Sequence, residues 1–198
     1  MPKKKLDIIG VSELELWDKF LGGDQDAYNR IVKTFSKQMF NYGFRICQNE
    51  DMVRDCIQDV FLRLWNNRSN ISSTDSIKWY LLKSIKTCIL RESQKWQKND
   101  ELENDYTFKV EFDVETKLIS EIENQHLANK IKSIINQLPT RQKEILYLRF
   151  YEGMDLSQIS ELMDISTQSV YNLLQKAYKS FRAEWLPLVL LLFLNTVK

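Results

Sequence analysis

Polar side chains recur near the end of the chain at the spacing of one helix face, and their chemistry suits contacts to nucleic acid. Glutamine and asparagine amides can pair with adenine through two hydrogen bonds, and hydroxyl and ammonium groups can contact phosphate. The opposite face is apolar through Val170, Leu174 and Ala177, so this helix should bury one side. The predicted DNA-contacting residues are Ser166, Thr167, Gln168, Ser169, Tyr171, Asn172, Gln175 and Lys176.

A shorter helix is predicted directly before this one. Asp155 and Gln158 have the spacing of a capping box, and after Asp164 a new N-cap is expected at Ser166. A helix, a tight turn and a second helix indicate a helix-turn-helix motif. An ordinary helical hairpin has the same pattern, so the motif alone leaves that alternative open.

The helix predicted from about Asp51 to Trp65 has the clearest periodicity of the first half. Its apolar residues follow the i, i+3, i+4, i+7 rule from Val53 onward and should face a core. The residues left on the outside are Asp55, Gln58, Asp59 and Leu62. This face is either an ordinary solvated surface or, because it exposes a leucine among acids, a docking surface.

A long helix is predicted from about Asp75 to Lys98, with an apolar side led by Ile77 and a cationic outer ridge. The ridge consists of Trp79, Lys83, Lys86, Thr87, Arg91 and Lys95. An aromatic ring can stack on an unpaired base while cations follow the phosphate backbone. The alternative is that Trp79 is a half-buried core residue.

Composition and charge predict an all-α protein with two small helical domains joined by a flexible linker. The chain has 5 Gly and 3 Pro in 198 residues, which favours long helices over hairpins. Residues 1–98 hold seventeen Lys and Arg against twelve Asp and Glu, and an acidic stretch follows them. We expect domains at residues 1–98 and 115–185, an acidic linker at 99–114 and an apolar tail at 186–198.

Residue types that catalysis or metal binding require are scarce or scattered. The only histidine is His126, and Cys47, Cys56 and Cys88 show no CxxC spacing. No glycine-rich phosphate loop occurs, so we expect no enzyme activity, metal, cofactor or small-molecule substrate. The apolar run after Lys3–Lys5 is too short for a signal peptide, and unpaired cysteines suit the cytoplasm.

Two segments resemble the extracytoplasmic-function (ECF) branch of the sigma-70 family. DMVRDCIQDVFLRLW at Asp51–Trp65 is similar to polymerase-binding region 2.2. LPTRQKEILYLRFYEGMDLSQISELMDIS, from Leu138, and the SVYNLL that follows it are similar to region 4. The resemblance covers nearly the whole chain.

The resemblance implies an alternative sigma factor that binds core RNA polymerase and helps to melt promoter DNA. The first domain would be region 2, on the −10 element, and the second would be region 4, on the −35 element. Asp55, Gln58, Asp59 and Leu62 would meet the β′ clamp helices, and the β flap of polymerase is a further implied contact. The cationic ridge would correspond to regions 2.3 and 2.4, and an anti-sigma factor is an implied partner.

The chain departs from the family pattern at a few positions. Relatives often place Asn and Asp four residues apart where this chain has Thr87 and Arg91, which bears on base choice at −10. Asp164 replaces a usual glycine in the turn, and Ser160 replaces a usual alanine. Aspartate can adopt the left-handed conformation at modest cost.

Two other functions remain open on the residues alone: a helix-turn-helix regulator that binds operators by itself, and a helical adaptor that binds no DNA. The segment before the motif favours the sigma factor. The apolar run at Trp185–Leu194 is too short to span a membrane, which takes about 20 residues. It could pack on the second domain, touch a membrane surface or, as we hypothesise, contribute to a site for an anti-sigma partner.

Overall fold

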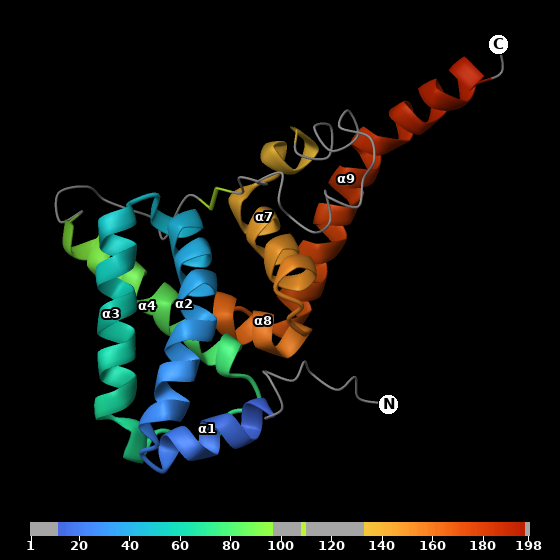
Figure 1. Ribbon diagram of the computed structural model, residues 1–198. Coiled ribbons are helices and arrows are strands. Elements are labelled where there is room, and N and C mark those ends of the chain that lie inside the picture. Colours follow the sequence, from blue (N-terminus) through green and yellow to red (C-terminus); the bar gives the residue numbers. More distant parts are fainter. Residues whose placement is uncertain (1–11, 97–107, 110–132, 197–198) are drawn as a thin grey trace. The chain divides into compact units, whose positions relative to one another are not determined.

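The computed structural model describes residues 12–96, 108–109 and 133–196, and most of these residues are helical (Figure 1). The chain divides into two units, Met1–Asp105 and Tyr106–Lys198. The described part contains no strand, which confirms the all-α class expected from the sequence.

The described residues of the first unit form a bundle of four α-helices with one short 3-10 turn. Three of its helices, α2, α3 and α4, pack on one another, and α1 packs on α2. Figure 1 shows α2 and α3 side by side, with α1 across one end of the pair. The elements are α1 (Glu13–Leu21), α2 (Gln25–Cys47), α3 (Glu50–Asn66), η1 (Arg68–Asn70) and α4 (Ile77–Trp96).

Side-chain caps start the first three helices, and in the sequence Ser12, followed by Glu15, and Asp24 predict two of these starts. Ser12 accepts a hydrogen bond from the Glu15 amide at 3.1 Å, and Asp24 accepts one from the Ala27 amide at 2.9 Å. Asn49 is the cap of the third helix, and its side-chain oxygen lies 3.0 Å from the Met52 amide. Each cap satisfies an amide that would otherwise lack a partner at a helix start.

A glycine allows α2 to approach α3 and α4 closely. An ideal Cβ added at Gly43 would lie 2.9 Å from Ile89 Cδ1 and 3.0 Å from Val53 Cγ1. Both distances are shorter than ordinary carbon contacts of about 3.5–4.0 Å. The fully buried core of the first unit includes Trp17, Phe20, Ile31, Met39, Tyr42, Val53, Ile77, Leu81, Ile85 and Ile89.

The second unit packs two short helices against one long helix. Its elements are α7 (Thr140–Leu146), which continues as the π-helical turn η2 (Tyr147–Tyr151), then α8 (Leu156–Met163) and α9 (Thr167–Thr196). Both α7 and α8 contact α9. The apolar residues from Leu118 to Ile135 also predict a helix before Leu138, and the structure describes it only over residues 133–137, where Ile134 and Ile135 are buried. The earlier part of that prediction lies outside the described residues.

One residue of the predicted linker belongs to the core of the second unit. Phe108 is fully buried, and its ring lies 5.7 Å from that of Tyr147. The hydroxyl of Tyr147 donates a 2.8 Å hydrogen bond to the buried carboxylate of Glu152, which satisfies both groups. The linker was predicted to be flexible, with no residue packed in a core. Phe108 could not be recognised as a core residue because a single aromatic side chain gives no apolar periodicity.

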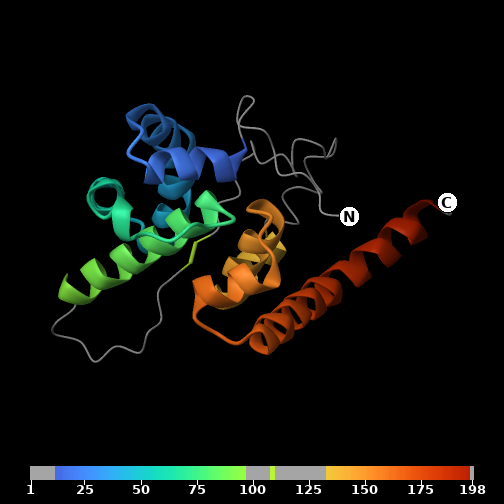
Figure 2. The same ribbon diagram turned by 90° about the horizontal axis from the view of Figure 1, so that it is seen from below.

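The last helix crosses the boundary predicted between the second domain and the apolar tail. It runs without a break from Thr167 to Thr196, and both views show its end extending beyond α7 and α8 (Figures 1 and 2). The side chains from Glu184 onward lie outside the described part, so the three roles considered for the tail stay predictions. No described helix has the length and apolar character needed to cross a membrane.

The close approach at Gly43 yields a prediction about stability. We expect Gly43→Val to lower the free energy of unfolding by about 1–3 kcal/mol, since the added carbons must displace Ile89 and Val53 in a closed core. Urea titration followed by circular dichroism measures this change. Lys33→Val, at an exposed position of the same helix, introduces the same β-branched side chain without the steric conflict. Equal losses for the two variants would contradict the close packing.

Candidate nucleic-acid interface

The turn between α8 and α9 is fixed by caps on both of its sides. At the start of α8, Asp155 accepts from the Gln158 amide at 2.8 Å, and the Gln158 side chain accepts from the Asp155 amide at 3.2 Å. This reciprocal pair is the capping box predicted from the sequence. At the start of α9, Ser166 accepts from the Ser169 amide at 3.1 Å. The predicted helix-turn-helix is therefore present.

Asp164 closes α8 in the left-handed conformation, at φ 52° and ψ 51°. Its amide, and that of Ile165, return to the carbonyl of Ser160. Ser160 is nearly buried, with 9% of its surface exposed, so a small side chain is needed at this junction. The structure confirms the expectation that aspartate can replace glycine in this turn.

The exposed face of α9 carries the predicted DNA-contacting residues. Ser169 is partly exposed, and the exposed members are Ser166, Thr167, Gln168, Tyr171, Asn172, Gln175 and Lys176. Val170, Leu174 and Ala177 are buried on the other side, as predicted. This face of α9 is therefore polar and exposed to solvent.

Two amides on this face are joined to each other. Gln168 Nε2 donates to Asn172 Oδ1 at 3.2 Å. The pair still offers an amide oxygen from Gln168 and an amide nitrogen from Asn172. One acceptor and one donor are what the major-groove edge of adenine requires.

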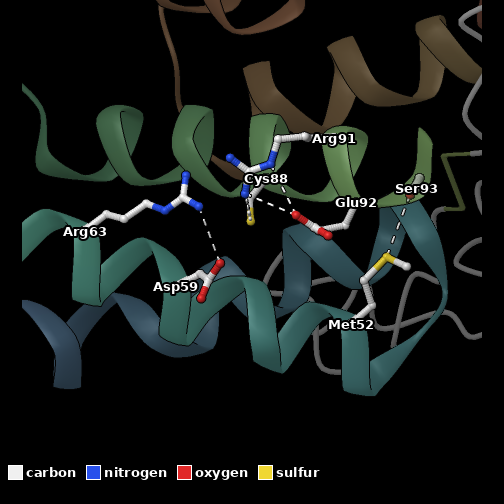
Figure 3. Close-up of polar contacts among 7 residues, drawn as sticks. All are labelled: Met52, Asp59, Arg63, Cys88, Arg91, Glu92 and Ser93. Carbon is white, nitrogen blue, oxygen red and sulfur yellow. Dashed lines mark hydrogen bonds and ion pairs between the residues drawn. The ribbon is translucent and has the colours of Figure 1, made fainter. Parts of the chain in front are cut away.

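The outer face of α3 has the composition predicted for a docking surface. Its members Asp55, Gln58, Asp59 and Leu62 are all exposed, and Leu62 has 60% of its surface in contact with solvent. Asp59 forms an ion pair with Arg63 at 3.7 Å (Figure 3). The face therefore combines negative charge with an uncovered apolar side chain.

Four of the six predicted ridge residues on α4 lie at the surface, at least in part. Trp79, Lys83 and Arg91 are half-buried, and Thr87 is exposed. The ammonium group of Lys83 lies 4.9 Å from the centre of the Trp79 ring, a cation–π distance. Hydrogen bonding to Glu92 raises the pKa of Arg91, so this guanidinium stays charged.

The placement of Lys86 on the ridge is wrong. Only 6% of its surface is exposed, because the 3.6-residue repeat of the helix puts it beside the buried Leu82 and Ile89. Lys86 thus belongs to the inner side of α4. The side chain of Lys95 lies outside the described residues.

A cavity of about 450 Å³ lies between the end of α3 and the ridge. Trp79, Lys83 and Arg91 line it from α4, and Arg63 and Asn67 line it from the α3 side. Sequence reasoning missed the residues from α3, although Arg63 stands one turn after Asp59 and could have been noticed. The lining also includes Tyr80, whose pKa is raised by burial. The cavity therefore combines two aromatic rings with cations from two helices.

Metal chemistry finds no support in the described residues, which contain no group of three or more His, Cys, Asp or Glu side chains able to hold an ion. The three cysteines are free thiols, and two of them are buried.

Both units match one family. Residues 31–98 match the family described as Sigma-70 region 2, and residues 128–181 match Sigma-70, region 4. The chain therefore belongs to the sigma-70 family, with α3, α4 and most of α2 in the first match and the helix-turn-helix in the second.

Relatives place it in the ECF branch. The chain is 24% identical to "RNA polymerase sigma factor SigV" of Bacillus subtilis (strain 168). The aligned region spans 154 residues and covers 77% of this chain and 87% of that protein. It is 18% identical over 169 residues to "ECF RNA polymerase sigma factor SigW" of the same organism, covering 82% and 90%. It is an alternative sigma factor for transcription initiation.

Solved structures share its fold. CnrH, solved in complex with the cytosolic domain of CnrY, has a TM-score of 0.52 and 16% identity, covering 85% of this chain and 93% of that one. The sigma factor RpoE from Bartonella quintana, solved with the anti-sigma factor NepR, has a TM-score of 0.53 and 11% identity, covering 80% and 96%.

The left-handed turn yields a testable prediction. We expect Asp164→Val to destabilise the second unit by about 1–2 kcal/mol, because a β-branched residue tolerates positive φ poorly. Asp164→Gly removes the conformational cost of the positive φ, so this variant should be at least as stable as the wild type. Thermal unfolding followed by circular dichroism compares the two variants. A valine variant as stable as the glycine variant would contradict the observed conformation.

Proposed function

We propose that this protein binds core RNA polymerase through the outer face of α3 and places the α4 ridge on the opened −10 region. The supporting observation is that both surfaces belong to one packed pair of helices. The face of α3 is acidic with an exposed leucine, and the ridge of α4 is cationic with an aromatic residue. A protein partner on α3 would therefore hold the ridge of α4 beside the DNA.

The contact on α3 would suit a partner that is basic and partly apolar. Leu62 supplies an uncovered side chain, and burying one leucine is worth about 1.5–3 kcal/mol. Asp55 and Asp59 would give charge complementarity, which favours fast association and correct register. The β′ clamp helices are the proposed site on polymerase, and the β flap is the proposed site for region 4.

The cavity beside the ridge would serve strand separation. An unpaired base leaving the duplex can stack on Trp79 or Tyr80, and stacking is worth about 1–3 kcal/mol per base. Lys83, Arg91 and Arg63 lie at the same cavity and could hold the phosphates on either side of that base. Thr87 would contact the strand from the exposed side of the ridge.

The second unit would hold the −35 element. The exposed face of α9 would lie in the major groove, with the start of the helix directed toward phosphate. Gln168 and Asn172 would read the bases, and Ser166, Thr167 and Lys176 would contact the backbone. The domains would then be residues 1–98 and 115–185, with 99–114 between them and 186–198 as a tail.

The setting of this activity is also part of the proposal. The protein would act in the cytoplasm, as a transcription factor without enzyme activity of its own. An anti-sigma factor is a proposed partner, since the solved relatives CnrH and RpoE were each captured with a second protein, named an anti-sigma factor for RpoE.

The α3 contact can be tested by charge reversal. We expect Asp59→Arg to weaken binding to core polymerase by at least about tenfold, since one unfavourable contact costs 1.4 kcal/mol or more. The fold should survive, because the ion pair lost with Arg63 is exposed and contributes little. Fluorescence anisotropy of labelled protein against purified core polymerase measures the affinity. Asp18→Arg, an exposed reversal on α1, is the matched control, and equal effects of both would refute the assignment.

The reading role of α9 can be tested by truncating one amide. We expect Gln168→Ala to reduce discrimination at one −35 position by about 1–3 kcal/mol, the worth of a good base contact. Run-off transcription with core polymerase on promoters that vary one base at a time gives the preference. Lys176→Ala should instead weaken all promoters alike and reduce the dependence on salt. An unchanged base preference in Gln168→Ala would remove it from the reading set.

A further inference from the structure

Two buried thiols lie at the same level of the α3–α4 pair. The helices run antiparallel, and Met52 Sδ lies 3.8 Å from Ser93 Oγ at one end of their contact (Figure 3). Cys56 follows Met52 by four residues, and Cys88 precedes Ser93 by five. At 1.5 Å per residue these steps are about 6 and 7.5 Å, so the two cysteines stand opposite each other.

The two side chains are in contact. Cys56 and Cys88 are 2% and 5% exposed, on the sides of α3 and α4 that pack together. Burial, and a hydrogen bond with the Cys88 thiol, raise the pKa of Cys56. Cys56 is therefore a protonated thiol held against a second sulfur.

The environment of Cys88 differs from that of Cys56. Cys88 belongs to the lining of the cavity, through which a small polar molecule can reach it. Its sulfur accepts a hydrogen bond from the Arg91 guanidinium at 3.6 Å, as Figure 3 shows. Cys56 is not among the residues that line the cavity. Cys88 is thus the member of the pair that faces the cavity and has a guanidinium N–H at its sulfur.

We propose that Cys56 and Cys88 form an oxidation site, in which a hydroperoxide oxidises Cys88 and Cys56 then closes a disulfide between α3 and α4. In the first step the Cys88 sulfur attacks one peroxide oxygen and the O–O bond breaks. The other oxygen leaves with the thiol proton, as water from hydrogen peroxide or as an alcohol from an organic hydroperoxide. The product is a sulfenic acid on Cys88. In the second step the Cys56 sulfur attacks the Cys88 sulfur, and the S–O bond breaks. Hydroxide leaves and takes the Cys56 proton as water.

Cys47 provides an internal contrast. Its thiol donates to the Gly43 carbonyl at 3.6 Å and also lies 3.7 Å from the Asn49 carbonyl. Burial raises the pKa of Cys47. Cys47 is not among the residues that line the cavity. The proposal therefore pairs Cys56 with Cys88 and leaves Cys47 reduced.

The test treats the full chain with hydrogen peroxide, blocks the remaining thiols after unfolding, and maps tryptic peptides by mass spectrometry. The three cysteines fall in separate peptides, at residues 46–54, 55–63 and 87–91. We expect a linked pair of peptides 55–63 and 87–91, lighter than their sum by two hydrogens, in the wild type and in Cys47→Ser. No covalent dimer should form, since the bond lies within one chain.

Single-cysteine variants separate the two steps. In Cys56→Ser the reaction should stop at the sulfenic acid on Cys88, which dimedone traps. In Cys88→Ser no disulfide should form, and Cys56 should still be alkylated after unfolding. Circular dichroism establishes whether each variant is folded. If one variant is unfolded, the peptide map of the wild type and of Cys47→Ser tests the proposal without it. A link to peptide 46–54, a link between chains, or full alkylation of Cys56 and Cys88 after peroxide would overturn the proposal.

Discussion

The packing of α3 against α4 determines which side chains of these two helices reach the surface of the first unit. Each helix buries one stripe of side chains, and the 3.6-residue repeat then decides which residues remain outside. Burying Cys56, Val60 and Leu64 turns the acidic face of α3 outward. Burying Leu81 and Ile85 leaves Trp79 and Lys83 at the surface of α4. The absence of a side chain at Gly43 lets α2 close the third side of the bundle.

In the second unit, local hydrogen bonds together with packing determine which side chains reach the surface. The caps at Asp155 and Ser166 and the left-handed Asp164 fix where α8 stops and α9 starts. Val170, Leu174 and Ala177 then set the rotation of α9 against its neighbours. Because packing fixes the apolar side of α9, the polar side chains are held together on its opposite side. DNA recognition requires such preorganisation.

Much of this arrangement could be predicted from the sequence, because periodicity reports burial along a single helix. The outer residues of α3 and α9 and the caps at Ser12, Asp24 and Asp155 follow from spacing alone. Contacts between elements could not be predicted in this way. Arg63 reaches a cavity shared with α4, and Phe108 enters a core far along the chain. Lys86 was placed on the exposed ridge because of its charge. Its position around the helix, beside Leu82 and Ile89, instead puts it on the buried side of α4.

The hydrogen bond between Gln168 and Asn172 makes these two residues act as one unit. Replacing either amide leaves the other without its partner and free to rotate, so the effects of two substitutions would not add. A change of base preference on this face is therefore most readily reached by altering both positions together. Divergence among relatives at the first of these positions should accordingly be accompanied by divergence at the second, one helical turn away.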